Sequence, residues 1–346
     1  MKHGCAGLAM GAALSFATAG SCFAQDNDAL ARFYRGKQIN VIIYSEAGST
    51  YDLYARLLSR HMGRHIPGAP NLVPQNMPGA GGLKATDYLY NIAPKDGSVI
   101  GTISRGNPFE PMLGGDKVNF DPLKFLWLGS MNREVAIAVS WFTSPVKTLS
   151  DLKQRELIIP GSGAGSDNEI MPLAFNNIVG TRFKIIAGYS GSTRATLAME
   201  RGEVDGMGYL TWGAITASQP GWLRDKKLNI LLRTGDVDDP NLAGVPKIRD
   251  AANNEVDRQA IDLLLSREVL GRPFLAPPAL PTDRAAMLKT AFIASVRDPQ
   301  LLDDAKKAHA DIDLVTGDEV SGLLQRVLGY PQEAIDRAKG ALNRAQ

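Results

Sequence analysis

The sequence predicts an α/β fold arranged as two lobes, and two observations lead to this prediction. Short apolar runs rich in β-branched residues alternate with amphipathic helical patterns along most of the chain. Such a βαβαβ rhythm favours parallel strands with helices on both faces of the sheet. The length of 346 residues is typical of about two domains, and the 44% hydrophobic composition supplies ample apolar side chains for their cores.

The first residues are typical of a secretory signal rather than of the folded protein. Lys2 begins a short basic region, residues 4–20 are small and apolar, and a small residue stands at Ala24. We therefore expect residues 1–24 to be a signal peptide, cleaved near Ala24 on export from the cytoplasm. A lipid anchor on Cys22 is the alternative. Both cysteines of the chain fall in this segment, so the mature protein would rely on its core without disulfides.

Strand and helix patterns follow in three blocks. The first block has strand patterns at 39–44, 72–77 and 98–104, separated by helical patterns at 51–62 and 83–92. The second has strand patterns at 135–142, 156–160, 183–187, 203–208 and 228–233, with helical patterns at 167–179 and 193–201. The last is mainly helical, at 253–270, 283–296, 299–308 and 317–328.

These blocks predict the domain organisation. We expect residues 27–130 and 246–346 to form a first lobe, because the C-terminal part returns to cover the beginning of the fold. Residues 131–245 are expected to form a second lobe. Each lobe is predicted to hold a mostly parallel sheet flanked by helices.

Glycine-rich turns stand where predicted strands give way to predicted helices. Within 72–82 a strand pattern ends at a proline, and three glycines follow within four residues. Similar turns occur near Gly48, Gly161 and Gly188. The free N–H groups and the dipole at a helix start attract anions, and ligands of open α/β sheets bind beyond the carboxyl ends of the strands. One such turn is commonly only a tight turn, but four of them favour a protein that binds a small molecule.

Several other functions lack the residues that they need. The formal net charge of +2 and the lack of a basic stripe argue against a nucleic-acid partner. Residues 161–166 depart from a dinucleotide-binding fingerprint at Ser166, where a glycine is required. His61 and His65 have a spacing that can hold zinc, but Met62 replaces the glutamate of a metalloprotease, so we expect surface histidines. With no nucleophile, base, metal or cofactor to name, the sequence predicts a protein that is not an enzyme.

Six motifs occur in order over nearly the whole mature chain, and together they resemble one family. They lie at 48–56, 75–82, 93–97, 161–166, 188–192 and 202–205, and include the element Asn-Met-Pro-Gly-Ala-Gly-Gly. This ordered set resembles the substrate-binding receptors of tripartite tricarboxylate transporters, of the Bug or TctC type.

The resemblance implies a periplasmic binding protein of type II, with two α/β lobes and a hinge. Such a receptor captures a small carboxylate-bearing solute between its lobes, acts as a monomer and delivers the solute to membrane permease subunits. The resemblance places ligand-binding residues of the first lobe at Ser49, Thr50, Tyr51, Asp52, Gly79, Ala80, Gly81 and Gly82. Those of the second lobe fall at Ser162, Gly163, Ser166, Asp167, Tyr189, Ser190, Ser192 and Asp205.

Two departures from the family pattern bear on the ligand. Ser49 replaces the second of two paired glycines in the first turn, and Arg105 follows the third strand, where small polar residues are commoner. We add Ser104 and Arg105 to the predicted binding residues. Arg105 is either a two-pronged partner for a second carboxylate or a solvated loop arginine.

The sequence leaves the solute open among aliphatic dicarboxylates, tricarboxylates, aromatic acids and amide-bearing ligands. Two alternative functions remain at this point. One is a solute-sensing module that feeds a signalling partner. The other is a hydrolase on the same scaffold, for which no acid–base pair can be named.

Overall fold

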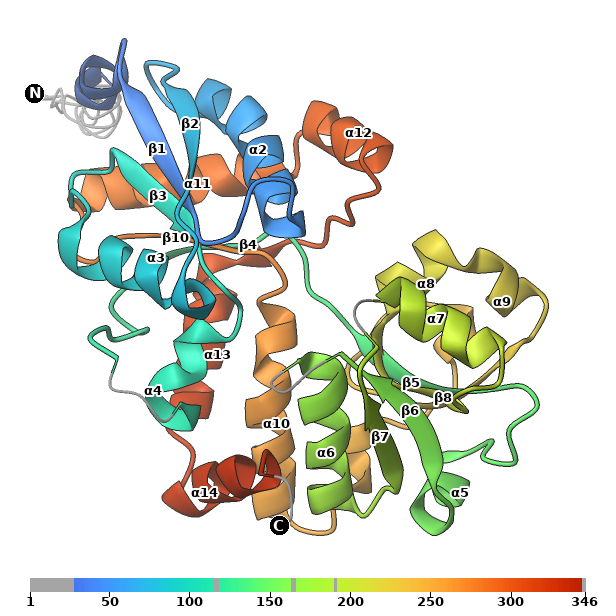
Figure 1. The fold of residues 1–346 in the computed structure, drawn as a ribbon. Helices are drawn as coiled ribbons and strands as arrows, with labels where there is room; N and C mark the ends of the chain where they lie inside the picture. The colour runs from blue at the N-terminus through green and yellow to red at the C-terminus, as the bar shows by residue number, and fades with distance from the viewer. Residues whose placement is uncertain (1–27, 115–117, 163–165, 190–191, 344–346) are drawn as a thin grey trace, which may run out of the picture.

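A computed structural model describes residues 28–114, 118–162, 166–189 and 192–343 of the chain. The predicted signal peptide lies outside these residues. The described part forms two α/β bodies that lie side by side, with a long helix running between them (Figure 1). Among the described residues, no helix combines the length and apolar character that crossing a membrane requires.

The first body is built on a six-stranded sheet with the order β11-β4-β10-β3-β1-β2. Its strands are β1 (Gln38–Ile43), β2 (Asn71–Asn76), β3 (Val99–Thr102), β4 (Leu126–Ser130), β10 (Pro273–Ala276) and β11 (Val315–Thr316). β1 is parallel to β2 and β3, whereas β10 is antiparallel to β3 and β4, and β11 is antiparallel to β4. The α/β class is confirmed, but the prediction of a mostly parallel sheet is wrong. β10 and β11 come from the C-terminal part of the chain and are antiparallel to their neighbours. In the part of the chain that the structure describes, no βαβ crossover, the connection that joins parallel strands, links them to these neighbours.

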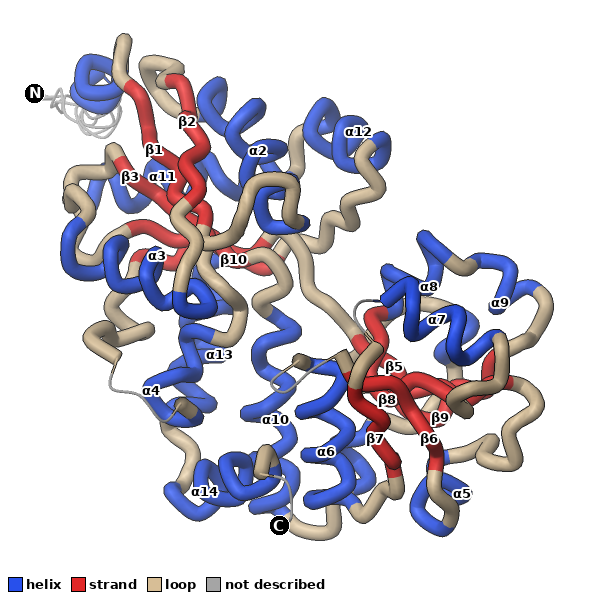
Figure 2. The backbone as a smooth tube through the Cα atoms, in the orientation of Figure 1, coloured by secondary structure: helices blue, strands red, loops and turns tan. Residues whose placement is uncertain are grey.

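The second body combines antiparallel and parallel strands. β5 (Ala136–Trp141) lies between β8 (Gly206–Thr211) and β9 (Leu228–Arg233) and is antiparallel to both, while β6 (Leu157–Gly161) and β7 (Phe183–Ala187) form a parallel pair. Here too the prediction of a mostly parallel sheet is wrong. β5 carries the chain into this body and β9 carries it back, so these neighbours run in opposite directions (Figure 2).

Helices cover both bodies and join them. Those of the first body are α2 (Thr50–Met62), α3 (Leu83–Asp87), α4 (Glu110–Leu113), α11 (Thr282–Val296), α12 (Pro299–Lys307) and α13 (Gly317–Leu328). The second body carries α5 (Leu149–Gln154), α6 (Asp167–Val179), α7 (Ser192–Glu200), α8 (Trp212–Ser218) and α9 (Pro220–Arg224). The remaining long helices are α10 (Glu255–Val269) and α14 (Gln332–Ala341). Short helical turns are η1 (Gly63–His65), η2 (Ala80–Gly82), η3 (Tyr88–Ile92), η4 (Asn107–Phe109), η5 (Pro240–Leu242) and η6 (Ile248–Ala251).

Helix α10 is packed between the two bodies. It contacts α13 and α14 on one side and α6 on the other (Figure 1). Leu263 and Leu264 of α10 are buried in the same apolar cluster as Phe175 of α6 and Trp127 of β4. The long helix α10 therefore packs against both bodies. The lobe boundaries at 130/131 and 245/246 stay a prediction.

His61 of α2 and His65 of the following turn η1 fasten this segment to α12 and to Asp298, which caps α12. The Nε2 of His61 lies 3.0 Å from a carboxylate oxygen of Asp304, and the Nε2 of His65 lies 2.8 Å from one of Asp298. His61 is only 6% exposed, so the prediction of a surface histidine is wrong there. Its position follows from helix spacing, because Leu57, Leu58 and His61 share one face that packs inward.

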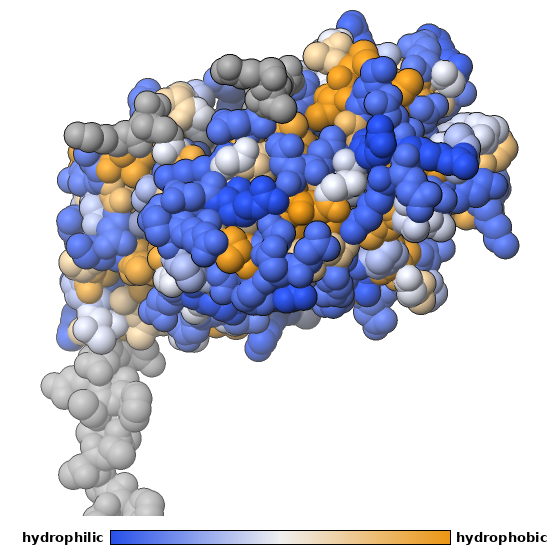
Figure 3. Space-filling view, turned by 90° about the horizontal axis from the view of Figure 1, so that it is seen from below, coloured by the Kyte–Doolittle hydropathy of each residue, from blue (hydrophilic) through white to orange (hydrophobic). Residues whose placement is uncertain are grey.

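The face of the molecule that is seen from below is mostly hydrophilic (Figure 3). In the view from below, apolar side chains occur in small groups separated by polar ones (Figure 3). Large exposed apolar residues come from separate elements, among them Ile92, Phe142 and Leu302. Scattered residues of this kind are ordinary on protein surfaces and do not mark a docking face.

Candidate functional site

Two cavities meet at one ion pair between the two bodies. A cavity of 420 Å³ is lined by Tyr44, Tyr51, Gly81, Ser104, Arg105, Gly106, Asn107, Glu110, Glu134, Asp167, Arg267 and Arg272. A cavity of 330 Å³ is lined by Arg105, Pro160, Ser162, Asp167, Asn168, Ala195, Met207, Gly208, Tyr209, Leu210, Thr211 and Ala214. Arg105, from the loop after β3, and Asp167, the first residue of α6, line both. We call the larger one the arginine cavity and the smaller one the apolar cavity.

A network of arginines and carboxylates forms the floor of the arginine cavity. Arg105 makes ion pairs with Glu134 and with Asp167. Arg267 of α10 lies 3.2 Å from Asp167, and Arg272 lies 3.0 Å from Glu134. Three guanidinium groups thus share two carboxylates in this network of described residues, which leaves an excess of positive charge.

The network is largely shielded from solvent. The side chains of Arg105, Arg267 and Arg272 are only 15%, 15% and 12% exposed. Burial disfavours the charge of Arg105, but Glu134 and the other nearby acidic groups hold its pKa above the ordinary value, so it stays a cation. Arg105 is therefore not a solvated loop arginine.

Two of these arginines carry unused hydrogen-bonding capacity. The Nε atoms of Arg267 and Arg272 are buried without a hydrogen-bond partner among the described residues. A buried donor without a partner costs free energy, so these two arginines are held in place at a cost.

Tyrosine rings hold Arg272 in place. Its guanidinium lies 4.7 Å from the ring centre of Tyr51 and 5.3 Å from that of Tyr54, within the range of cation–π attraction. Tyr51 in turn packs edge to face on Tyr44, with the ring centres 4.6 Å apart. This aromatic wall orients the guanidinium, whose planar fork suits a carboxylate.

The first glycine turn is closed by its own aspartate. The side chain of Ser49 caps α2 by accepting from the Asp52 N–H, while the Gly48 N–H donates to the Asp52 carboxylate at 2.9 Å. The Asn76 amide also donates to this carboxylate at 2.9 Å. Burial opposes ionisation of Asp52, but hydrogen bonds from Arg56, Gly48 and Asn76 lower its pKa to about 2. Donors predicted to face a ligand are therefore used to build the turn.

The second glycine turn forms part of the cavity wall. Gly81 lines the arginine cavity and Gly82 has a φ of +95°. A Cβ on Gly82 would lie 2.8 Å from the Tyr44 ring and 3.0 Å from the Asn107 amide nitrogen. Only glycine allows this close approach between the turn and the residues beside it.

The structure brings together one part of the predicted binding set. Tyr51, Gly81, Ser104, Arg105, Ser162 and Asp167 line the two cavities. The other predicted residues that the structure describes line neither cavity; these are Ser49, Thr50, Asp52, Gly79, Ala80, Gly82, Ser166, Tyr189 and Asp205. Ser192 is the first residue of α7, and Gly163 and Ser190 lie outside the described residues.

Asp205 shows why motif position alone misplaces a residue. Its carboxylate accepts from the Ile158 N–H at 3.2 Å, and its own N–H donates to the Ile158 carbonyl at 2.8 Å. Ile158 stands near the start of β6, whereas the cavities lie beyond the end of that strand at Ser162. Asp205 therefore joins β6 to the start of β8.

Glu134, Arg267 and Arg272 line the arginine cavity but were not predicted from the sequence. Arg267 interrupts an otherwise buried stretch of α10, and Arg272 precedes the fully buried strand β10. An arginine next to a buried apolar segment was the available signal, but its partners come from distant parts of the chain. Among the described residues, no group of three or more histidine, cysteine, aspartate or glutamate side chains is arranged to hold a metal ion.

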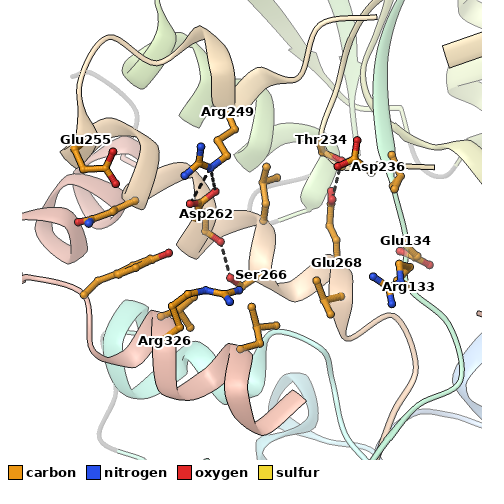
Figure 4. Close-up of a pocket in the computed structure, with 18 residues that line it drawn as sticks. Arg133, Glu134, Thr234, Asp236, Arg249, Glu255, Asp262, Ser266, Glu268 and Arg326 are labelled. Atoms are coloured by element: carbon orange, nitrogen blue, oxygen red, sulfur yellow. Dashed lines mark hydrogen bonds and ion pairs between the residues drawn. The ribbon is translucent and has the colours of Figure 1, made fainter. Parts of the chain in front are cut away.

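A third cavity of 650 Å³ is lined mainly by residues of α10 and α13 (Figure 4). Arg249 pairs with Asp262 at 2.7 Å on one wall. Deeper in the cavity, the Glu268 carboxylate accepts from the hydroxyls of Thr234, at 2.7 Å, and Tyr209. Burial raises the pKa of Glu268 to about 7, although Thr234, Tyr209 and Arg105 act in the opposite direction.

This raised pKa predicts a pH dependence of stability. Between pH 4.5 and about 7 the folded protein holds a proton on Glu268 that the unfolded chain releases, so the free energy of unfolding falls as the pH rises through this range. Glu268→Gln keeps an oxygen acceptor without the charge. Urea unfolding at each pH gives the free energy of unfolding of the variant and of the original protein. We expect the value of the variant minus that of the original to increase by about 2–3 kcal/mol from pH 4.5 to pH 8. Glu156→Gln, at an exposed pair, is the control, and parallel pH profiles would contradict the prediction.

The lowered pKa of Asp52 predicts the opposite pH dependence of the free energy of unfolding. Its lowered pKa means that its contribution is complete above pH 3.8 and is lost as the pH falls towards 2. Asp52→Asn should lower the free energy of unfolding by about 1–2 kcal/mol at pH 7 and by much less at pH 2.5. Denaturant unfolding at both pH values measures the difference, with exposed Asp238→Asn as the control. An equal loss at both pH values would show that the charge is not what stabilises the turn.

Comparison with known proteins identifies the fold. No protein-family model matches the sequence, and a search of curated proteins finds no relative. Among solved structures, a TctC solute-binding protein from Polaromonas has a TM-score of 0.69 at 17% identity, over 89% of this chain and 98% of that one. An R. palustris protein solved with adipate has a TM-score of 0.58 at 18% identity, over 88% and 97% of the two chains.

A third match points in the same direction. MatC from Rhodopseudomonas palustris, solved with bound malate, has a TM-score of 0.56 at 18% identity, over 89% of this chain and 99% of MatC. All three alignments extend over nearly the full length of both chains. The chain therefore has the two-lobed α/β fold of the TctC-type solute-binding proteins.

Proposed function

We propose that this protein is a periplasmic receptor that captures a small carboxylate-bearing solute and delivers it to the permease subunits of a tripartite tricarboxylate-type transporter. One observation carries the proposal: three arginines share two carboxylates in a shielded cavity between the two bodies. Support comes from the ordered motifs, from the fold, and from two proteins of that fold solved with malate and adipate.

The proposed binding step joins the two lobes. Residues 27–130 and 246–346 would form one lobe and contribute Arg105, and residues 131–245 would form the other and contribute Ser162. A solute that contacts both sides favours the closed arrangement over the open one. Each charge-assisted hydrogen bond to a carboxylate contributes about 1.5–3 kcal/mol, so a few of them suffice for micromolar affinity.

The proposal includes location and form. The protein would reach the periplasm through a signal peptide cleaved near Ala24 and act there as a monomer without enzymatic activity. Its binding step needs no cofactor or metal, because arginine side chains supply the positive charge.

The first test is a thermal-shift screen of the mature protein. A solute that binds only the folded state raises the melting temperature, by an amount equivalent to about 2.7 kcal/mol at one hundred times its dissociation constant. We expect shifts with members of a panel of succinate, malate, adipate, citrate and benzoate, and none with the corresponding amides. A flat response to all the acids would argue against the proposed ligand class. Loss of uptake on deletion of the gene tests delivery to a transporter.

Arg272 provides a sharper test. Arg272→Met removes a guanidinium that faces the arginine cavity, so calorimetry should show about a 10- to 100-fold weaker binding of the best acid in the panel. Arg272→Lys should recover only part of this affinity, because the ammonium lacks the planar fork. Arg224→Met removes the same charge from an exposed pair and should leave binding unchanged. Equal affinities of Arg272→Met and the original protein would place the carboxylate elsewhere.

A further inference from the structure

Asp167 is held in the way that arginines hold a bound carboxylate. Its two oxygens contact different guanidinium groups: Oδ2 contacts Arg105, and Oδ1 lies 3.2 Å from Arg267. Asp167 starts α6 in the second body, whereas Arg105 follows β3 in the first. A carboxylate of the protein thus crosses between the two bodies and occupies the cationic centre of the site.

The two carboxylates of the network differ in how firmly they are held. Glu134 is 14% exposed, pairs with Arg105 and Arg272, and its backbone N–H donates to the Glu268 carbonyl at 2.8 Å. Asp167 is 29% exposed and stands in the first turn of a helix. An aspartate there can turn away from the arginines and remain favourably placed beside the positive end of the helix dipole. Asp167 is therefore the carboxylate that can be displaced.

The cavities support this view. The Arg105–Asp167 pair lines both of them, so it stands at their boundary. When Asp167 turns away, the arginine cavity opens towards the apolar cavity, whose walls include Met207 and Leu210. The joined space offers cations at one end and apolar side chains at the other, which suits an aliphatic chain that carries carboxylates.

The charge balance indicates how many carboxylates the solute carries. The network holds three guanidinium groups and two carboxylates, an excess of one positive charge that becomes two without Asp167. Glu110 also lines the arginine cavity and adds a negative charge to its wall, but among the described residues it makes no ion pair with the three arginines. A dianion therefore matches the charge of the ion-pair network when Asp167 leaves.

We propose that Asp167 occupies the place of a solute carboxylate in the ligand-free protein, and that the solute is an aliphatic dicarboxylate that displaces it from Arg105 and Arg267. The part that names the solute rests on the proposed function, whereas the placement of Asp167 does not. Asp167 is then an internal competitor: a monocarboxylate replaces its single charge without net gain, and a dicarboxylate adds a second contact.

Paired probes of equal chain length test the solute class. Calorimetry would compare adipate with hexanoate, and succinate with butyrate, on the mature protein. We expect the better dicarboxylate to bind at least 10-fold more tightly than its monocarboxylate partner. Asp167→Asn, which removes the competing charge, should strengthen dicarboxylate binding by about 10-fold. Glu156→Gln, which removes one charge from a pair within the second body, is the matched control and should bind as the original protein does.

Three binding results would overturn the proposal. These are a monocarboxylate that binds as tightly as its dicarboxylate partner, an Asp167→Asn variant with unchanged dicarboxylate affinity, and a variant with weaker affinity. Thermal melting of each variant confirms that it is folded. An unchanged variant affinity together with tight dicarboxylate binding would reject the role of Asp167 and leave the proposed function standing.

A ligand-free measurement separates the two proposals. Amide hydrogen exchange of the original protein, Asp167→Asn and Glu156→Gln would be followed in residues 104–107 and 168–171, the segments that the ion pair joins. We expect exchange there to be at least 5-fold faster in Asp167→Asn than in the other two proteins. Equal protection in all three would reject the cross-lobe role of Asp167. Faster exchange without binding of any acid would reject the solute and the proposed function but retain that role.

Discussion

The structure depends on the sharing of two carboxylates by three arginines between its two bodies. Guanidinium groups are stable in such a shielded place only when acidic partners or bound anions offset their charge. Glu134 meets this need from the segment that leads into β5, and Asp167 meets it from the start of α6. The loop after β3, the end of α10 and the start of α6 are therefore held in one arrangement by electrostatics as well as by packing.

Helix α10 connects this network to the rest of the molecule. Arg267 lines the arginine cavity, and the next residue, Glu268, lines the cavity of 650 Å³, where its carboxylate accepts from the hydroxyls of Thr234 and Tyr209 (Figure 4). Tyr209 also lines the apolar cavity, so adjacent residues of one helix contact the walls of three cavities. A change in protonation of Glu268 would act on the second body through Tyr209, next to the ion pair that joins the two bodies.

Periodicity predicted many of the elements well, because apolar spacing reflects which face of a segment is buried. The helix expected at 167–179 is α6, and the strand expected at 39–44 is β1 within one residue. Strand direction was not predictable in this way. β10 and β11 join the first sheet after the chain has passed through the second body, and no local pattern reports such a return. β4 was missed because it precedes no helix within the βαβ rhythm.

The glycine turns were predicted as the anion site, but in the structure they are held largely by contacts within the protein itself. Asp52 accepts the Gly48 N–H that a ligand would need, and Gly82 is required by the contact with Tyr44 and Asn107. Glycine patterns are visible in a sequence because neighbouring residues form them. An arginine cluster built from positions 105, 267 and 272 is not, because its members meet only after the chain has folded. In the proposed receptor these arginines supply the positive charge that binds a carboxylate, so selectivity would depend on the residues that compete for them, above all Asp167.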